Sequence, residues 1–138
     1  MNWEFFSLEI RSLSNKIKKF DEYKPNVIVG VVRGGIIPAR ILSTELNIKE
    51  VYCLNVSKKA TERKVVTEIL EDLVGKNILL VEDVLETGLS MIAAKKYLEN
   101  KGARVKTASL YITENSIITP DFYLNRVEFP FTFSFPWE

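Results

Sequence analysis

The sequence contains no histidine and a single cysteine, Cys53. Without histidine the chain has no imidazole base, so proton transfer in any active site falls to carboxylates. A lone cysteine allows no intrachain disulfide, and without histidine it does not make a protein-only zinc site. We interpret Cys53, which lies in an apolar run, as a small buried hydrophobic residue rather than a nucleophile.

The chain also lacks a large excess of charge and a long apolar run. It carries 19 Lys and Arg against 18 Asp and Glu, a formal net charge of +1, which argues against a general affinity for nucleic acid. No apolar stretch approaches the roughly 18 residues of a membrane-spanning helix, and Met1–Phe6 does not resemble a signal peptide. We therefore expect a cytoplasmic protein with neither a membrane nor a nucleic-acid partner.

The composition is that of one globular domain. Hydrophobic residues make up 46% of the chain and charged residues 27%, and 138 residues suffice for one ordinary core. We expect a single domain over residues 1–138, with its core in about 21–112. Prolines and aromatic residues alternate in the C-terminal part, about 113–138, which predicts a small irregular aromatic hood packed against the main sheet.

Apolar runs alternate with helical spacing along the core. Runs of β-branched residues predict strands covered on both faces, and apolar residues at three- and four-residue steps predict amphipathic helices. The predicted strands are Val27–Val32, Val51–Val56, Ile78–Val81 and Val105–Ile112. The predicted helices are Trp3–Phe20, Ile37–Leu46 and Met91–Leu98. This alternation favours an α/β fold with an open, mainly parallel, doubly wound sheet flanked by helices.

Two segments follow the second predicted strand. Ser57–Lys64 is polar and has no apolar anchor, so we expect a mobile loop there. Val65–Leu70 contains enough apolar and β-branched residues to form a short return strand.

Two adjacent carboxylates, Glu82 and Asp83, stand where the predicted strand Ile78–Val81 ends. Ligands of open α/β sheets bind at such strand ends, and buried carboxylates there need cations or hydroxyl donors, which a magnesium-bound sugar diphosphate supplies. The following Glu86-Thr87-Gly88-Leu89-Ser90 offers hydroxyls, a permissive glycine and a helix N-terminus that attracts phosphate. Taken singly, these pieces also occur as helix caps and ordinary turns.

Four apolar residues followed by Glu82 to Ser90 form one long pattern. It resembles the signature with which type I phosphoribosyltransferases bind 5-phosphoribosyl-1-pyrophosphate (PRPP). The resemblance implies that Glu82 and Asp83 bind the ribose hydroxyls and orient Mg²⁺ indirectly, through ligand or water. It also implies that Glu86, Thr87, Gly88, Leu89 and Ser90 hold the 5-phosphate, and that Glu86 is the catalytic residue that manages the purine proton.

A second loop, Arg33-Gly34-Gly35, connects the predicted strand Val27–Val32 to the predicted helix Ile37–Leu46. Paired glycines let backbone N–H groups approach a phosphate, and Arg33 adds a fixed positive charge, although a tight turn with a solvated arginine has the same sequence. The dinucleotide fingerprint and the nucleotide P-loop are both absent from the chain. The loop resembles the pyrophosphate-binding loop of purine phosphoribosyltransferases.

Within that family the sequence is most similar to the small xanthine-guanine and hypoxanthine enzymes, whose closing motif resembles Phe135-Pro136-Trp137-Glu138. The resemblance implies that Glu138 holds the exocyclic edge of the purine and that Lys58, Lys59 and Arg63 lie in the mobile catalytic loop. A solvated run of charges explains those cations equally well. The chain departs from the family in three places. Glu86 replaces an aspartate, and Ile112-Thr113-Glu114 provides no purine-binding lysine after the predicted strand Val105–Ile112. Thr132 replaces a stacking aromatic residue, and we expect Thr132 and its neighbour Phe133 to contact the purine.

The resemblance implies a purine phosphoribosyltransferase that uses Mg²⁺ and transfers phosphoribose from PRPP to guanine, xanthine or hypoxanthine, in a homodimer. Two alternatives stay open: a PRPP-binding regulator without catalysis, and an enzyme for a different nitrogen base. A phosphoacceptor receiver domain also carries an acidic pair after a buried strand. Its pair lies near the N-terminus, however, and Glu82-Asp83 comes too late in this chain.

Overall fold

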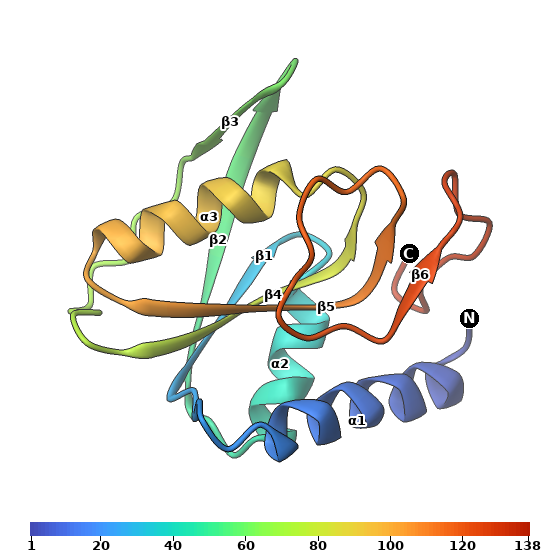
Figure 1. Cartoon of the computed structure of the whole chain (residues 1–138), viewed down its shortest axis with the longest axis horizontal. Coiled ribbons are helices and arrows are strands. Elements are labelled where there is room, and N and C mark those ends of the chain that lie inside the picture. Colours follow the sequence, from blue (N-terminus) through green and yellow to red (C-terminus); the bar gives the residue numbers. More distant parts are fainter.

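The computed structural model describes residues 1–138 and has three helices and six strands (Figure 1). The helices are α1 (Trp3–Lys19), α2 (Ile36–Glu45) and α3 (Leu89–Asn100). The strands are β1 (Val27–Val32), β2 (Glu50–Lys59), β3 (Glu62–Val65), β4 (Asn77–Leu85), β5 (Arg104–Thr113) and β6 (Asn125–Val127). Each predicted helix is present, and both of its ends lie within two residues of the expected positions.

The six strands form one open sheet in the order β3-β2-β1-β4-β5-β6. β1 pairs in parallel with both β2 and β4, and β5 pairs in parallel with both β4 and β6, so only β2 and β3 are antiparallel. The predicted mainly parallel, doubly wound sheet is therefore confirmed. β1 lies between β2 and β4 in the middle of the sheet. Every residue from Val27 to Val31 is therefore buried, as expected for a strand covered on both faces.

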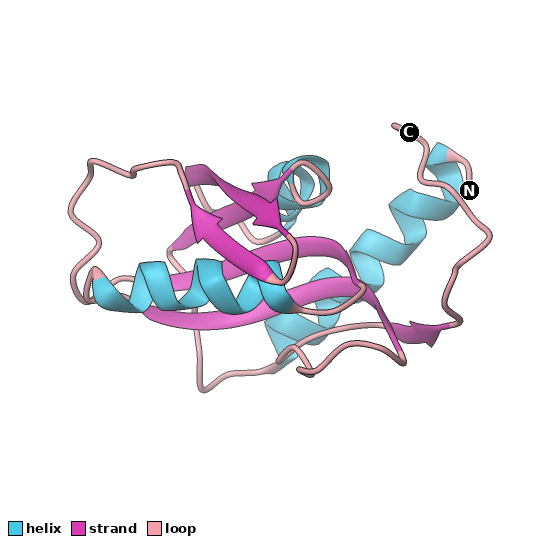
Figure 2. Cartoon of the chain, turned by 90° about the horizontal axis from the view of Figure 1, so that it is seen from above, coloured by secondary structure: helices cyan, strands magenta, loops and turns pink.

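Helices cover both faces of this sheet (Figures 1 and 2). α1 and α2 lie on one face and share a hydrophobic cluster with β1, β4 and β5. α3 lies on the other face, where Met91, Ala94 and Leu98 pack against the opposite sides of the same strands. No helix is both long enough and apolar enough to cross a bilayer.

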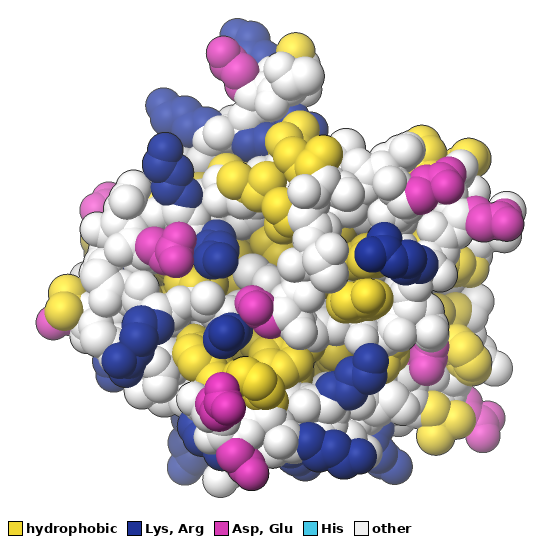
Figure 3. All heavy atoms as spheres, viewed as in Figure 1, with side chains coloured by type: hydrophobic (Ala, Val, Ile, Leu, Met, Phe, Trp, Pro, Cys, Tyr) yellow, Lys and Arg dark blue, Asp and Glu magenta, His cyan; other side chains and the backbone are white.

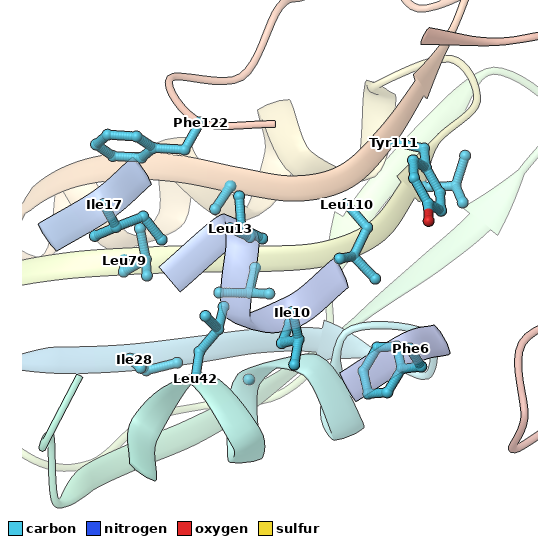
Figure 4. Close-up of a cluster of buried hydrophobic side chains, with 14 of the residues drawn as sticks. Phe6, Ile10, Leu13, Ile17, Ile28, Leu42, Leu79, Leu110, Tyr111 and Phe122 are labelled. Atoms are coloured by element: carbon cyan, nitrogen blue, oxygen red, sulfur yellow. The ribbon is translucent and has the colours of Figure 1, made fainter. Parts of the chain in front are cut away.

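The spacing of α1 accounts for its place in the first cluster (Figure 4). Four apolar side chains, spaced four, three and four residues apart, form one stripe along the helix and are at most 2% exposed: Phe6, Ile10, Leu13 and Ile17. They meet Leu42 of α2 and Leu79 of β4, which are fully buried. α1 is thus fixed to the sheet by its own side chains, although it precedes the first strand.

The segment expected to be a loop, Ser57–Lys64, is instead a β-hairpin. β2 continues to Lys59, and β3 runs back beside it with Lys58 opposite Arg63. The expected return strand at Val65–Leu70 is also wrong, because β3 ends where that segment begins. Hairpin pairing needs only local backbone hydrogen bonds, so an apolar anchor is not required. Whether the hairpin moves remains a prediction.

The C-terminal residues form the expected aromatic hood and reach beyond the sheet to α1. β6 adds three residues to the sheet edge beside β5. The buried Phe135 ring stacks on Tyr111 of β5 with centroids 6.2 Å apart, and the Trp137 ring meets Phe6 of α1 at 4.9 Å. The two ends of the chain are therefore packed against each other, close to one end of β5 (Figure 1).

Replacing Phe6 by alanine tests how far the fold depends on this contact. Phe6 is 1% exposed and touches both the core cluster and Trp137, so we expect Phe6→Ala to lower the free energy of unfolding by about 3–5 kcal/mol. The neighbouring Phe5 is 50% exposed, and Phe5→Ala should change stability by less than about 1 kcal/mol. Urea unfolding of both variants measures the difference; equal losses would contradict the packing.

Candidate functional site

The candidate functional site lies beside β1 at the centre of the sheet, from which the strand order runs outward in both directions. β1 has β2 on one side, reached through α2, and β4 on the other, which is followed by α3. In doubly wound sheets such a switch point leaves a crevice beyond the carboxyl ends of the two strands. A cleft of about 760 Å³ occupies this position.

The cleft is lined mainly by polar and charged groups from five parts of the chain. Its lining residues are Val32, Arg33, Gly34, Lys58, Arg63, Glu82, Asp83, Val84, Glu86, Thr87, Gly88, Ser90, Trp137 and Glu138. Both predicted loops, the hairpin and the chain end are therefore brought together. Only three of the fourteen are hydrophobic, which suits a strongly hydrated ligand such as a phosphorylated sugar.

Five predicted site residues do not border the cleft: Gly35, Lys59, Leu89, Thr132 and Phe133. Gly35 is buried below its loop, and Lys59 is exposed on the hairpin. Phe133 packs between Phe131 and Tyr111 with centroids about 5 Å apart, inside the aromatic hood. Their predicted ligand contacts remain untested.

Trp137 borders the cleft but is absent from the predicted base contacts. The sequence analysis used it only as part of the closing motif Phe135-Pro136-Trp137-Glu138. Its position beside Glu138 was the available signal, because consecutive residues at a chain end can reach one site together.

The acidic pair lies inside β4 rather than beyond its end. The pairing of β4 with β1 stops at Val81, opposite Gly30, while the pairing with β5 continues through Glu82 and Val84 to Leu85. One edge of β4 is thus open where the two carboxylates stand. Both Glu82 and Asp83 border the cleft.

Burial makes the two carboxylates hard to ionise. It raises the pKa of Glu82 to about 8, and the neighbouring charge of Asp83 adds to the effect. Burial also raises the pKa of Asp83, although the Val84 N–H, which donates to the Asp83 carboxylate at 2.6 Å, opposes the shift. Neither carboxylate takes part in an ion pair within the chain. The site therefore calls for a bound cation or hydroxyl donors.

The two carboxylates suit Mg²⁺ as partial ligands only. No group of three or more Asp, Glu, Cys or His side chains is placed to hold a metal ion by itself. Mg²⁺ prefers six oxygen ligands and keeps several waters or phosphate oxygens when it binds to one or two carboxylates. Glu82 and Asp83 thus fit a metal that arrives with a diphosphate.

The loop after β4 forms a cradle at the start of α3. Gly88 precedes the helix with φ of 83°, a left-handed conformation that favours glycine. The Thr87 carbonyl accepts from Ile117 N–H at 2.9 Å, and the Thr113 hydroxyl donates to the Glu86 carbonyl at 2.8 Å. The segment after β5 therefore holds the loop in place. Leu89 N–H donates to the Thr87 hydroxyl at 3.3 Å, and the next two N–H groups of α3, on Ser90 and Met91, are free to bind an anion.

The loop after β1 lies directly against β4 because two glycines allow it. A side chain at Gly34 would collide with the Asp83 carboxylate, and one at Gly35 would collide with the Val81 carbonyl. Gly35 N–H donates to Val31 at 2.8 Å, which closes the turn. Arg33 thereby stands at the cleft beside the acidic pair, on a loop whose Val32–Arg33 peptide bond is cis.

A family model for the phosphoribosyl transferase domain matches residues 2–137, nearly the whole chain. The chain belongs to the phosphoribosyltransferase family. Enzymes of this family are glycosyltransferases that use PRPP, and the cleft of this phosphoribosyltransferase lies where the fold binds its ligands.

Relatives with known names include purine and pyrimidine enzymes. A xanthine-guanine phosphoribosyltransferase from Idiomarina loihiensis is 29% identical over 100% of this chain and 85% of its own. The crystal structure of a purine phosphoribosyltransferase from Pyrococcus horikoshii is 30% identical, with a TM-score of 0.85, over 100% of this chain and 92% of that one. An orotate phosphoribosyltransferase from Bartonella henselae is 34% identical over 77% of this chain, which spans only 52% of that protein.

The raised pKa of Glu82 predicts a pH-dependent effect of Glu82→Gln in the ligand-free protein. The carboxyl titrates near 4.5 when unfolded and near 8 when folded, so between these values the folded state holds a proton that the unfolded state releases. Stability from this group therefore falls as pH rises from 4.5 through 8. We expect Glu82→Gln to raise Tm increasingly over that window, as measured by calorimetry without Mg²⁺. A Tm difference independent of pH would contradict the assignment.

Proposed function

We propose that this phosphoribosyltransferase transfers phosphoribose from PRPP to a 6-oxopurine, guanine, xanthine or hypoxanthine, and releases pyrophosphate. The observation that carries the proposal is the single cleft that joins the phosphate cradle, the acidic pair and the Arg33 loop. These three parts match the three parts of PRPP: a 5-phosphate, a ribose diol and a diphosphate. The named purine enzymes among the relatives support the choice of base.

The proposed roles follow the chemistry of each part of the cleft. The cradle of Glu86, Thr87, Gly88, Leu89 and Ser90 receives the 5-phosphate through hydroxyls and the N-terminus of α3. The carboxylates of Glu82 and Asp83 accept hydrogen bonds from the ribose hydroxyls and help to orient Mg²⁺ through ligand or water. The loop of Arg33, Gly34 and Gly35 faces the pyrophosphate.

In the proposed reaction the bond from ribose C1 to the diphosphate oxygen breaks, and a bond from C1 to a purine nitrogen forms. Positive charge develops on the ribose, which the nearby carboxylates stabilise, and negative charge develops on the leaving pyrophosphate, which Arg33 stabilises. Bound Mg²⁺ supplies further neutralisation of the diphosphate. Glu86 accepts the proton that the purine nitrogen loses.

The hairpin adds two cations to the pyrophosphate side of the cleft in this proposal. Lys58 and Arg63 are opposite each other in the β2–β3 pairing, and both border the cleft. Arg63 donates to the carbonyls of Ala60 and Glu62 at 2.9 Å, so its guanidinium is tied to the hairpin tip. Closure of the hairpin would bring these charges over the diphosphate and exclude water.

The base end of the cleft leaves two alternatives for the function. Ile112-Thr113-Glu114 provides no lysine donor at the end of β5, where the purine enzymes resembled by the sequence carry one. Orotate phosphoribosyltransferases from Bartonella henselae and Sulfurisphaera tokodaii are 34% and 33% identical to the chain. An enzyme for another nitrogen base is therefore the second candidate. A regulator that binds PRPP without turnover is the third.

The proposal also includes a homodimer in the cytoplasm. It assigns purine contacts to Thr132, Phe133 and Glu138, of which Glu138 borders the cleft.

A panel of bases separates these candidates. The protein is incubated with PRPP and Mg²⁺ and with guanine, xanthine, hypoxanthine, adenine or orotate in turn, and nucleotide and pyrophosphate are quantified. We expect equimolar nucleotide and pyrophosphate with a 6-oxopurine. Product with orotate or adenine alone would replace the proposed base, and PRPP binding without turnover of any base would favour the regulator.

Glu86 is the position to test for chemistry. Its side chain is exposed at the cleft and makes no hydrogen bond or ion pair within the chain, so Glu86→Gln should cost at most about 1 kcal/mol of stability. If Glu86 takes the purine proton, Glu86→Gln should lower kcat by roughly 10²-fold or more and change PRPP affinity little.

The matched control for Glu86→Gln is Glu99→Gln, which removes an exposed carboxylate of α3 outside the cleft and should leave kcat unchanged. Equal rates for wild type and Glu86→Gln would reduce Glu86 to a residue of the loop. Glu86→Asp restores the residue usual in the family and tests whether the longer side chain limits the rate.

A further inference from the structure

The loop after β4 is held by a short stretch of chain, residues 113–118, which we call the backing segment. The parallel pairing of β4 with β5 ends at Leu85 and Ile112. At the next step, where β4 gives way to the loop, the Thr113 hydroxyl donates to the Glu86 carbonyl at 2.8 Å. We propose that Thr113 is a positioning residue for the 5-phosphate cradle, an inference that rests on the proposed function.

Thr113 acts on a ligand only through the backbone of Glu86. Its side chain is 0% exposed and does not border the cleft, so it does not touch a molecule bound there. No other N–H or O–H group of the chain donates to the Glu86 carbonyl. A carbonyl that loses its donor is costly unless it reaches water, so removal of the Thr113 hydroxyl favours a displaced loop.

Thr113 also orders the rest of the backing segment. Asn115 N–H donates to the Thr113 hydroxyl at 3.2 Å, and Ser116 N–H donates to the Thr113 carbonyl at 3.2 Å, so the chain turns directly after β5. After this turn Ile117 N–H donates to the Thr87 carbonyl at 2.9 Å. The segment therefore holds two consecutive carbonyls of the loop, and one hydroxyl takes part at both ends of that support.

The backing segment also stands directly against Gly88, the last residue before α3. A Cβ atom at Gly88 would lie 2.7 Å from Ile118 Cγ1 and 3.1 Å from Ser116 Oγ. The Ser116 hydroxyl donates to the Ile118 carbonyl at 2.7 Å, which fixes its side chain. The loop is thus closely packed on this side and keeps its shape before an anion binds at the start of α3, which lowers the entropy lost on binding.

Loss of the Thr113 hydroxyl tests the role. Thr113→Val replaces the hydroxyl by a methyl group and should raise the Kd for ribose 5-phosphate, measured by calorimetry, by about tenfold, the size of one lost hydrogen bond. The Kd for pyrophosphate with Mg²⁺ should change by less than about twofold, because that ligand is assigned to another loop. The Arg33-Gly34-Gly35 loop makes no hydrogen bond with the backing segment.

Two further variants separate positioning from a general loss of stability. Thr113→Ser keeps the hydroxyl and should recover most of the affinity for ribose 5-phosphate. Ser109→Ala removes another 0% exposed hydroxyl of β5, which donates to the Tyr111 carbonyl at 3.0 Å and not to the loop. It should lower Tm by an amount similar to Thr113→Val and leave the Kd for ribose 5-phosphate unchanged.

The outcomes that contradict this inference differ from those that contradict the proposed function. An unchanged ribose 5-phosphate Kd in Thr113→Val, the same loss in Thr113→Ser, or an equal loss in Ser109→Ala would overturn the role of Thr113. An equal loss of pyrophosphate affinity in Thr113→Val would also overturn it, because the damage would then be general. If the wild type binds neither ribose 5-phosphate nor PRPP, the proposed function itself fails.

Discussion

The site depends on one steric constraint, the close approach of the Arg33-Gly34-Gly35 loop to β4. A side chain at Gly35 would collide with the Val81 carbonyl, and one at Gly34 with the Asp83 carboxylate. With hydrogen in those places, the loop turns tightly and α2 begins directly beside the central strands. The cationic Arg33 and the acidic pair are consequently held at the same cleft, so a small change in backbone packing would separate the two halves of the site.

The close approach of this loop to β4 also places unpaired charges of both signs around the cleft, which a ligand can neutralise. Glu82 and Asp83 are partly buried without an ion-pair partner, and the pKa of each is raised. Arg33 and Lys58 also border the cleft without a salt bridge. On the face drawn in Figure 3, basic and acidic side chains are interspersed rather than gathered by sign. A magnesium-bound diphosphosugar would carry both kinds of charge, so it would complement each set in one binding event.

Most of the sheet, and the gathering of most of the residues expected to bind PRPP at one cleft, could be predicted because their signals are local. Buried strands such as Val27–Val32 are continuous apolar runs, and each candidate loop directly follows a strand. The hairpin could not be predicted from polarity, because backbone pairing between Lys58 and Arg63 requires no apolar residue. The place of Trp137 was hidden for another reason: it depends on contacts with Phe6, 131 positions away in sequence.

Long-range contacts of two different kinds hold the two sides of the cleft. The loop after β4 is held by the segment at and after the end of β5, where the Thr113 hydroxyl donates to the Glu86 carbonyl and the Ile117 N–H donates to the Thr87 carbonyl. The Trp137 side of the cleft is assembled from the hood and α1 through aromatic contacts of Trp137 with Phe135, Phe6 and Trp3. The Trp137 side thus depends on apolar packing, and the loop after β4 depends on directed hydrogen bonds.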